Sequence, residues 1–292
     1  MKQSILVTGA TGHFGKATIQ FLLEKGVSAN NISALVRSAE KAEAIKAKGI
    51  DIKVGDYDDY DSLVTAFNQV DHLLLVSSSD VVNRSKQQEN AVKAAIEAGV
   101  KHILYTSFYS NNTTDTSAIA FVSKSHLDTE QLIIESGIPY TIFKNNLYFE
   151  VLPMLFGDKV FESGIFLPAG STAAGFASRD DMAEVAANVL IESGHENKIY
   201  HLNNAVNTSI DDAAAILSAI AGKPITYTSP SSEVYFETLQ AAGVPNEYIG
   251  FFASFAEAIK AGEFKADHTD LPKLLQRTPT TLNSFLFNFY QK

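Results

Sequence analysis

The feature that most constrains this chain is a glycine-rich turn between a short apolar strand and an amphipathic helix. The strand is Ile5-Leu6-Val7, and apolar side chains recur at helical spacing from Phe14 to Leu22. Between them, Gly9, Gly12 and Gly15 follow the spacing G-x-x-G-x-x-G. A strand, a glycine turn and a helix in this order are typical of α/β folds built from βαβ units.

Apolar runs and helical patterns continue to alternate through the first half of the chain. Further strands are predicted at 32–36, 52–54, 73–76, 102–105 and 140–143. Helices are predicted between them at 39–48 and 84–98, and the end of a further helix at 127–136. Strands that are apolar on both faces form parallel sheets covered by helices on both sides. The predicted fold class is therefore α/β, with a Rossmann-type doubly wound parallel sheet.

The alternation loosens in the second half, which indicates a change of organisation. We predict a Rossmann domain over 1–150 and a smaller, helix-rich C-terminal lobe over 151–292. Residues 178–205 are expected to return to the first domain, because 180–193 has a helical pattern and 199–202 a strand pattern. The lobe would then cover the cleft at the edge of the sheet.

Composition narrows the possible partners and location. The 292 residues are 46% hydrophobic, enough for one large α/β domain or a domain with a smaller lobe. The absence of cysteine excludes disulfides, thiol catalysis and cysteine-bound metals, and the histidines show no H-E-x-x-H or H-x-x-x-H pattern. A formal net charge of −10 disfavours nucleic acid. With no membrane-length apolar stretch, we expect a cytoplasmic protein with a small-molecule partner, no metal, and a homodimer as the candidate assembly.

Ligands of open parallel sheets bind beyond the carboxyl ends of the strands. Small or polar residues follow the predicted strands at 8–15, 37, 56, 77–79, 106–107 and 144–146. In the first of these segments Gly9 suits a tight turn, Gly12 a close approach of a pyrophosphate, and Gly15 close packing of helix on sheet. The helix N-terminus would offer free N–H groups to the phosphates. These features predict a dinucleotide site.

The residue after the second strand indicates which dinucleotide binds. A site for NAD usually carries a carboxylate about 20 residues after the glycines, where it holds the ribose 2′-hydroxyl. This chain has Arg37 at that strand end, and a guanidinium suits the 2′-phosphate of NADPH. Asp56, after the third strand, is expected either to meet the adenine amino group or to cap the following helix.

Several stretches together resemble a known family. They include Val7-Thr8-Gly9-Ala10-Thr11-Gly12, Ala34-Leu35-Val36-Arg37, Asn145-Asn146-Leu147-Tyr148 and Gly194-His195-Glu196-Asn197-Lys198. In them the chain resembles the NmrA-like branch of the atypical short-chain dehydrogenases/reductases, and is similar to type 2 NAD(P)H:quinone oxidoreductases and triphenylmethane reductases. The resemblance, with the strand-end rule, predicts cofactor contacts from Thr8, Gly9, Ala10, Thr11, Gly12, His13, Phe14, Gly15, Arg37, Asp56, Val76, Ser77, Ser78, Thr106, Ser107, Phe143, Lys144, Asn145, Asn146, Leu147 and Tyr148.

The superfamily's Tyr-x-x-x-Lys dyad is missing. Its tyrosine position falls on Val122 and its lysine position on His126. Lys124 is offset by two residues, about 200° around a helix, and should point elsewhere. His126 and Tyr148 are the candidate catalytic groups: His126 as a proton donor, a partner of the nicotinamide ribose or a structural residue, and Tyr148 as a proton donor or a pocket wall.

These features favour an oxidoreductase that transfers hydride from NADPH to a quinone or a similar flat electrophile. Such acceptors stabilise the incoming electron density themselves, so the lost acid matters less than for an alcohol or sugar substrate. The alternative is a non-catalytic NADP(H) sensor that regulates a partner protein. Phe251, Phe252 and Phe255 lie at helical spacing and are expected to pack in the lobe or to roof a pocket, with core packing preferred.

Overall fold

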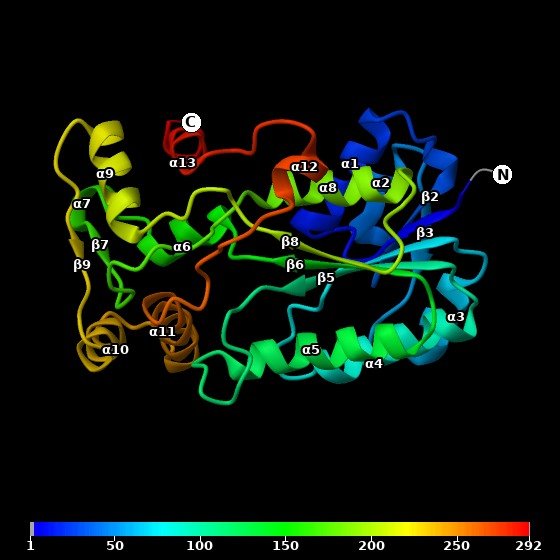
Figure 1. Ribbon diagram of the computed structural model, residues 1–292, viewed down its shortest axis with the longest axis horizontal. Helices are drawn as coiled ribbons and strands as arrows, with labels where there is room; N and C mark the ends of the chain where they lie inside the picture. Colours follow the sequence, from blue (N-terminus) through cyan, green and yellow to red (C-terminus); the bar gives the residue numbers. More distant parts are fainter. Residues whose placement is uncertain (1–2, 292) are drawn as a thin grey trace.

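A seven-stranded parallel sheet forms the centre of the computed structural model, which describes residues 3–291 (Figure 1). Its order is β3-β2-β1-β4-β5-β6-β8, and every neighbouring pair is parallel. The strands are β1 (Ile5–Val7), β2 (Ile32–Val36), β3 (Asp51–Val54), β4 (His72–Leu75), β5 (His102–Phe108), β6 (Tyr140–Asn145) and β8 (Lys198–Leu202). The strand order reverses between β1 and β4, which is where such sheets bind ligands. The predicted α/β fold class is confirmed.

Helices cover both faces of the sheet (Figure 1). One layer holds α1 (His13–Glu24), α8 (Arg179–Ile191) and α12 (Leu271–Leu275), and the other holds α3 (Tyr60–Phe67), α4 (Arg84–Glu97) and α5 (Ala120–Glu135). Each layer closes its own hydrophobic core over the sheet. The edge strands β3 and β8 are more exposed than the rest, because only one neighbour pairs with each.

Three predicted segments differ from the structure. The helix expected at 39–48 is a 3₁₀ turn (Ala39–Ala42) followed by the single-turn α2 (Glu43–Lys46). Strands β5 and β6 run further than predicted and end at Phe108 and Asn145. The apolar pattern stops earlier because the ends of both strands turn from core packing toward a polar edge, while backbone pairing between Ser107 and Lys144 continues.

The C-terminal region adds helices beyond one end of the sheet (Figure 1). They are α6 (Leu152–Phe156), α7 (Val160–Ser163), α9 (Ile210–Ala221), α10 (Ser232–Ala241), α11 (Asn246–Lys260) and α13 (Leu282–Tyr290). Two 3₁₀ turns (Ala29–Asn31, Phe149–Val151) and a small sheet of β7 (Ile165–Phe166) and β9 (Tyr227–Thr228) complete the elements. This region has a core of its own around Phe149, Phe176 and Phe264. None of the helices within residues 3–291 combines the length and apolar character needed to cross a bilayer.

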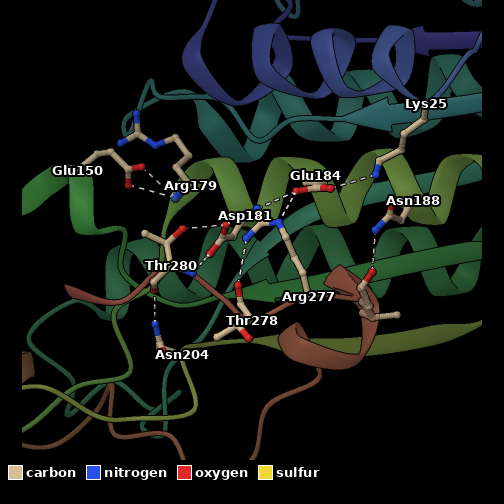
Figure 2. A network of polar contacts seen from close by, with 11 residues as sticks. Lys25, Glu150, Arg179, Asp181, Glu184, Asn188, Asn204, Arg277, Thr278 and Thr280 are labelled. Atoms are coloured by element: carbon tan, nitrogen blue, oxygen red, sulfur yellow. Dashed lines mark hydrogen bonds and ion pairs between the residues drawn. The ribbon is translucent and has the colours of Figure 1, made fainter. Parts of the chain in front are cut away.

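A polar network fastens the C-terminal segment to α8 (Figure 2). Asp181 is 1% exposed and accepts hydrogen bonds from the Thr280 backbone N–H (2.6 Å) and from Nη2 of Arg277 (2.7 Å). Glu184 accepts from Arg277 and from Lys25 of α1, at 2.7 and 3.0 Å. Burial opposes ionisation of Glu184, but these hydrogen bonds outweigh it and lower the pKa of that carboxyl. The network thus joins α1, α8 and the chain after α12.

Candidate active site

The turn after β1 has the geometry that its glycines predict. Gly9 has φ +57°, a backbone conformation that L side chains rarely adopt. A Cβ on Gly15 would lie 2.5 Å from the Gly9 carbonyl oxygen, so this helix turn tolerates no side chain. Gly12 is the N-cap of α1, and no side chain caps that terminus. The first N–H groups of α1 are therefore available to an anionic ligand.

Several side chains of the turn are committed to packing. Thr8 is fully buried, donates to the Leu74 carbonyl (3.0 Å) and accepts from the Val76 N–H (2.8 Å), which ties the turn to β4. Ala10 and Phe14 lie in the core below α1. A ligand at this turn would therefore meet backbone groups rather than these side chains.

The other predicted groups at the strand ends differ in exposure. Arg37 is exposed at the end of β2 and forms no ion pair within residues 3–291. Asp56 accepts a hydrogen bond from the Asp58 N–H (3.1 Å), and the N-cap of α3 is Asp59, so the alternative role of Asp56 as the helix cap is wrong. His13 contacts Asp180 of α8 at 2.9 Å.

A cavity of about 220 Å³ lies beyond the ends of β4, β5 and β6 and is bordered by α11. Apolar side chains dominate its wall. The lining residues are Ser77, Arg84, Ser107, Phe108, Val122, His126, Asn145, Asn146, Leu147, Tyr148, Val151, Met154, Leu155, Phe251, Phe252, Phe255 and Ile259. The three phenylalanines of α11 thus line the cavity, as the alternative of a pocket roof predicts, and Phe255 also packs against the lobe core. The packing of α11 against β5 through Phe255 and Phe108 puts them there.

Polar side chains form the smaller part of the cavity wall, and that of Asn145 has an oxygen without a partner. The Asn145 side chain donates from Nδ2 to the Tyr148 hydroxyl (3.2 Å), while its Oδ1 is buried without a hydrogen bond. A buried acceptor without a partner costs free energy unless a ligand donates to it. Burial raises the pKa of Tyr148, and the guanidinium of Arg179 lies 4.7 Å from its ring centre. Tyr148 is thus protonated, with the Arg179 guanidinium over its ring.

His126 has both ring nitrogens engaged. Its Nε2 lies 3.3 Å from Nη1 of Arg84, and its Nδ1 lies 2.8 Å from the Tyr105 hydroxyl. A guanidinium only donates, so Nε2 accepts and the ring proton sits on Nδ1. Burial, and then the charges of Arg84 and Lys144, lower the pKa of His126 well below its ordinary value. His126 is therefore neutral near pH 7.

The positions of the missing dyad are now visible in three dimensions. Val122 and His126 lie one turn apart on α5 and both line the cavity. Lys124 points to solvent and pairs with Asp128 at 2.7 Å, as its helical offset predicts. Lys144 does not line this cavity; it pairs with the buried Glu130 at 2.6 Å.

Only some of the predicted cofactor-contact residues line the cavity. Ser77, Ser107, Asn145, Asn146, Leu147 and Tyr148 line it, whereas the turn after β1, Arg37 and Asp56 lie along neighbouring strand ends. Thr106 and Phe143 are buried inside their strands. Sequence reasoning missed Arg84, although a cation in the first turn of a helix opposes the helix dipole and is a signal for a special role.

Comparisons with known proteins agree with this geometry. The model of the NmrA-like family matches residues 1–286. Quinone oxidoreductase 2 of Escherichia coli is 36% identical over 288 residues, which cover 97% of this chain and 99% of that protein. The crystal structure of the E. coli NADPH-dependent quinone oxidoreductase with NADPH superposes with a TM-score of 0.91 at 34% identity, covering 98% and 99% of the two chains.

A second solved structure is equally similar in fold. The triphenylmethane reductase of Citrobacter sp. in complex with NADP(H) has a TM-score of 0.90 and is 38% identical, covering 98% of this chain and 99% of that one. The family match spans nearly all of the sequence, and the resemblance drawn from the glycine turn and the later motifs is confirmed. The protein belongs to the NmrA-like family.

Proposed function

We propose that this protein is an NADPH-dependent oxidoreductase that reduces quinones or similar flat electrophilic acceptors. The observation that carries the proposal is the mainly apolar, aromatic-roofed cavity beyond β4, β5 and β6, whose lining residue Ser77 follows Val76, the neighbour of Gly9 in the glycine turn. A flat, uncharged ring fits such walls better than a sugar or a nucleotide does. The similarity to quinone oxidoreductase 2 supports the same reading.

The residues at the strand ends fit NADPH. The uncapped N-terminus of α1 would hold the pyrophosphate, and the guanidinium of Arg37, which forms no ion pair in the described part of the chain, would hold the 2′-phosphate. The partnerless Oδ1 of Asn145 is an acceptor suited to the amide of a nicotinamide. The remaining predicted contacts, from Thr8 to Tyr148, are part of this proposal.

Bound NADPH would supply a hydride, and the protein's own groups would orient the acceptor and keep the site dry. Phe251 and Phe255 cover the acceptor ring from α11, and Ser77 and Tyr148 offer hydroxyls at the wall. Val122 stands where a proton-donating tyrosine would be required for an alcohol or sugar substrate. A general acid typically contributes about 10²–10⁴-fold, and a quinone needs that contribution least because its product anion is resonance-stabilised.

The test is NADPH oxidation by the purified protein with a panel of quinones, azo compounds and cationic dyes, followed at the nicotinamide absorbance. We expect turnover with quinones and tighter binding of NADPH than of NADH. NADPH binding without turnover on any acceptor would replace this proposal with the NADP(H) sensor. The homodimer, the cytoplasmic location and the division of the chain near residue 150 remain predictions.

A further inference from the structure

Arg84 is a buried cation on the wall of an otherwise apolar cavity. It is the first residue of α4, is 8% exposed, and forms no ion pair with any carboxylate in residues 3–291. A buried charge is costly unless a counter-charge or strong hydrogen bonds compensate it. Its position in the first turn of a helix adds an unfavourable dipole interaction. The fold therefore retains Arg84 at this place at a cost in stability.

Two acceptors fix the guanidinium in one orientation. Nε donates to the Ser78 carbonyl at 2.7 Å, and Nη1 donates to Nε2 of His126 at 3.3 Å. His126 in turn donates from Nδ1 to the Tyr105 hydroxyl oxygen, and that hydroxyl donates its own proton to Gln88 at 3.1 Å. This chain of hydrogen bonds holds the guanidinium from behind, through α5 and β5.

The third nitrogen of the guanidinium is left for a ligand. Nη2 has no hydrogen-bond partner among the described residues. It is not fully buried either, so part of its surface is accessible. Arg84 is one of the residues that line the cavity, and Nη2 is the nitrogen of its guanidinium left without a partner among residues 3–291. The cavity wall therefore includes a positive group that is fixed in orientation and forms no ion pair within the described chain.

We propose that Arg84 binds the acceptor oxygen on which negative charge develops, and that His126 positions Arg84 rather than donating a proton. The inference rests on the proposed function. When a quinone accepts a hydride from NADPH, a C–H bond of the nicotinamide breaks, the quinone gains two electrons and one hydrogen, and a hydroquinone monoanion forms beside NADP⁺. Nη2 donates a hydrogen bond to that phenolate oxygen, and a solvent proton then completes the hydroquinone.

This assignment defines the class of acceptor. Carbonyl acceptors that become anions are favoured, because the guanidinium stabilises the charge as it forms. Cationic dyes become neutral on reduction and gain nothing from Arg84, so they are poorer substrates of this protein than quinones of similar size. A guanidinium does not release a proton near neutral pH, which separates its role from that of an acid.

A binding experiment on the unaltered protein tests the charge without any turnover. Calorimetry compares 2-naphthoate with 2-naphthamide, which have the same ring but differ in charge. We expect the carboxylate to bind about 10–150-fold more tightly, the effect of one charge-assisted hydrogen bond. Equal affinities, or tighter binding of the amide, would overturn the inference.

Variants on one helix test the same group in catalysis. For Arg84→Met we expect kcat with a neutral quinone to fall by about 10²–10³-fold, as for loss of an oxyanion donor, with NADPH affinity unchanged. Arg84→Lys should recover about a tenth of the activity, because it restores the charge without the two-point anchoring. Lys86→Met is the matched control, since Lys86 is 67% exposed on α4 and pairs only with Glu89 within the described chain.

The outcomes separate the two proposals. Quinone turnover with unchanged kcat in Arg84→Met refutes the role of Arg84 and leaves the proposed function intact. Selective binding of naphthoate without any quinone turnover supports the anion site and refutes the proposed function. If circular dichroism shows that Arg84→Met does not fold, the activity of Arg84→Lys and the relative affinities for 2-naphthoate and 2-naphthamide test the role of Arg84 instead. His126→Gln should lower kcat and the naphthoate preference together, whereas a proton donor would change kcat alone.

Discussion

His102 makes the stability of the fold dependent on pH. It lies at the start of β5, 5% exposed, with its ring 5.4 Å from that of His72. The Thr141 hydroxyl donates to the His195 carbonyl at 2.7 Å. Its oxygen is therefore the acceptor for Nε2–H of a neutral His102, at 3.0 Å. Burial, and then the charge of His72, lower the pKa of His102 from 6.5 to about 4.

The sign and the size of the effect follow from this shift. Between pH 6.5 and 4 the unfolded chain binds a proton at His102 that the folded chain refuses. Stability from this group is therefore present above pH 6.5 and is lost as the pH falls toward 4. With one pKa unit worth about 1.4 kcal/mol, the loss is about 2 kcal/mol by pH 5 and about 3 kcal/mol by pH 4.

Urea unfolding followed by circular dichroism at pH 7, 6 and 5 measures the effect. In His102→Gln an amide N–H replaces the Nε2 donor without a titration, so the variant should lose about 2 kcal/mol less than the wild type between pH 7 and pH 5. Thr141→Val is the control: it removes the hydrogen bonds, lowers stability at every pH, and keeps the wild-type pH dependence. Parallel pH curves for His102→Gln and wild type would refute the reasoning.

Three further outcomes test the cofactor site and the polar network. Arg37→Ala should weaken NADPH binding by roughly 10–150-fold and leave NADH binding unchanged, and equal wild-type affinities for the two cofactors would contradict the role of Arg37. Gly12→Val places a side chain at the N-cap of α1, with its Cβ 3.2 Å from the Gly9 oxygen. We expect this variant to lose NADPH binding while circular dichroism shows that it is still folded. Normal NADPH binding would show that the turn is not the phosphate site. Arg277→Met removes the hydrogen bond that Arg277 donates to the buried Asp181. We expect urea unfolding to show a free energy of unfolding lower by about 2–3 kcal/mol. A change under about 0.5 kcal/mol would mean that Thr280 alone satisfies the Asp181 carboxylate.

The core of the fold was predictable because its signals are local. Ile5–Val7 and the runs near β2, β4 and β5 are buried strands, and their apolar residues are adjacent in the sequence. Glycine spacing marked the turn because Gly9 needs a positive φ and Gly15 has no room for a Cβ. Boundaries were less predictable: β5 and β6 continue into Ser107 and Asn145, where backbone pairing persists after the apolar pattern has ended.

In the candidate site, too, the residues that follow strand ends were predictable from the sequence, whereas a residue placed by helix packing was not. Ser77, Asn145 and Tyr148 follow from the rule that ligands lie beyond strand ends, which needs only the order of strands. Arg84 does not, because nothing in its local sequence says what it faces. It meets His126, 42 residues away, only because α4 and α5 pack side by side on one face of the sheet.

The sequence by itself determined the α/β class and the glycine turn, and it placed Arg37 at the end of the second strand, since each depends on residues close together in the chain. Only the tertiary structure decided which side chains line the cavity. Phe251 and Phe255 line the cavity because α11 lies over the end of β5, and Phe255 packs against the lobe core as well. His126 became the neutral support of a buried guanidinium because helix packing brought three elements together at one point. Such contacts depend on the angles and distances between elements, which a local pattern does not encode.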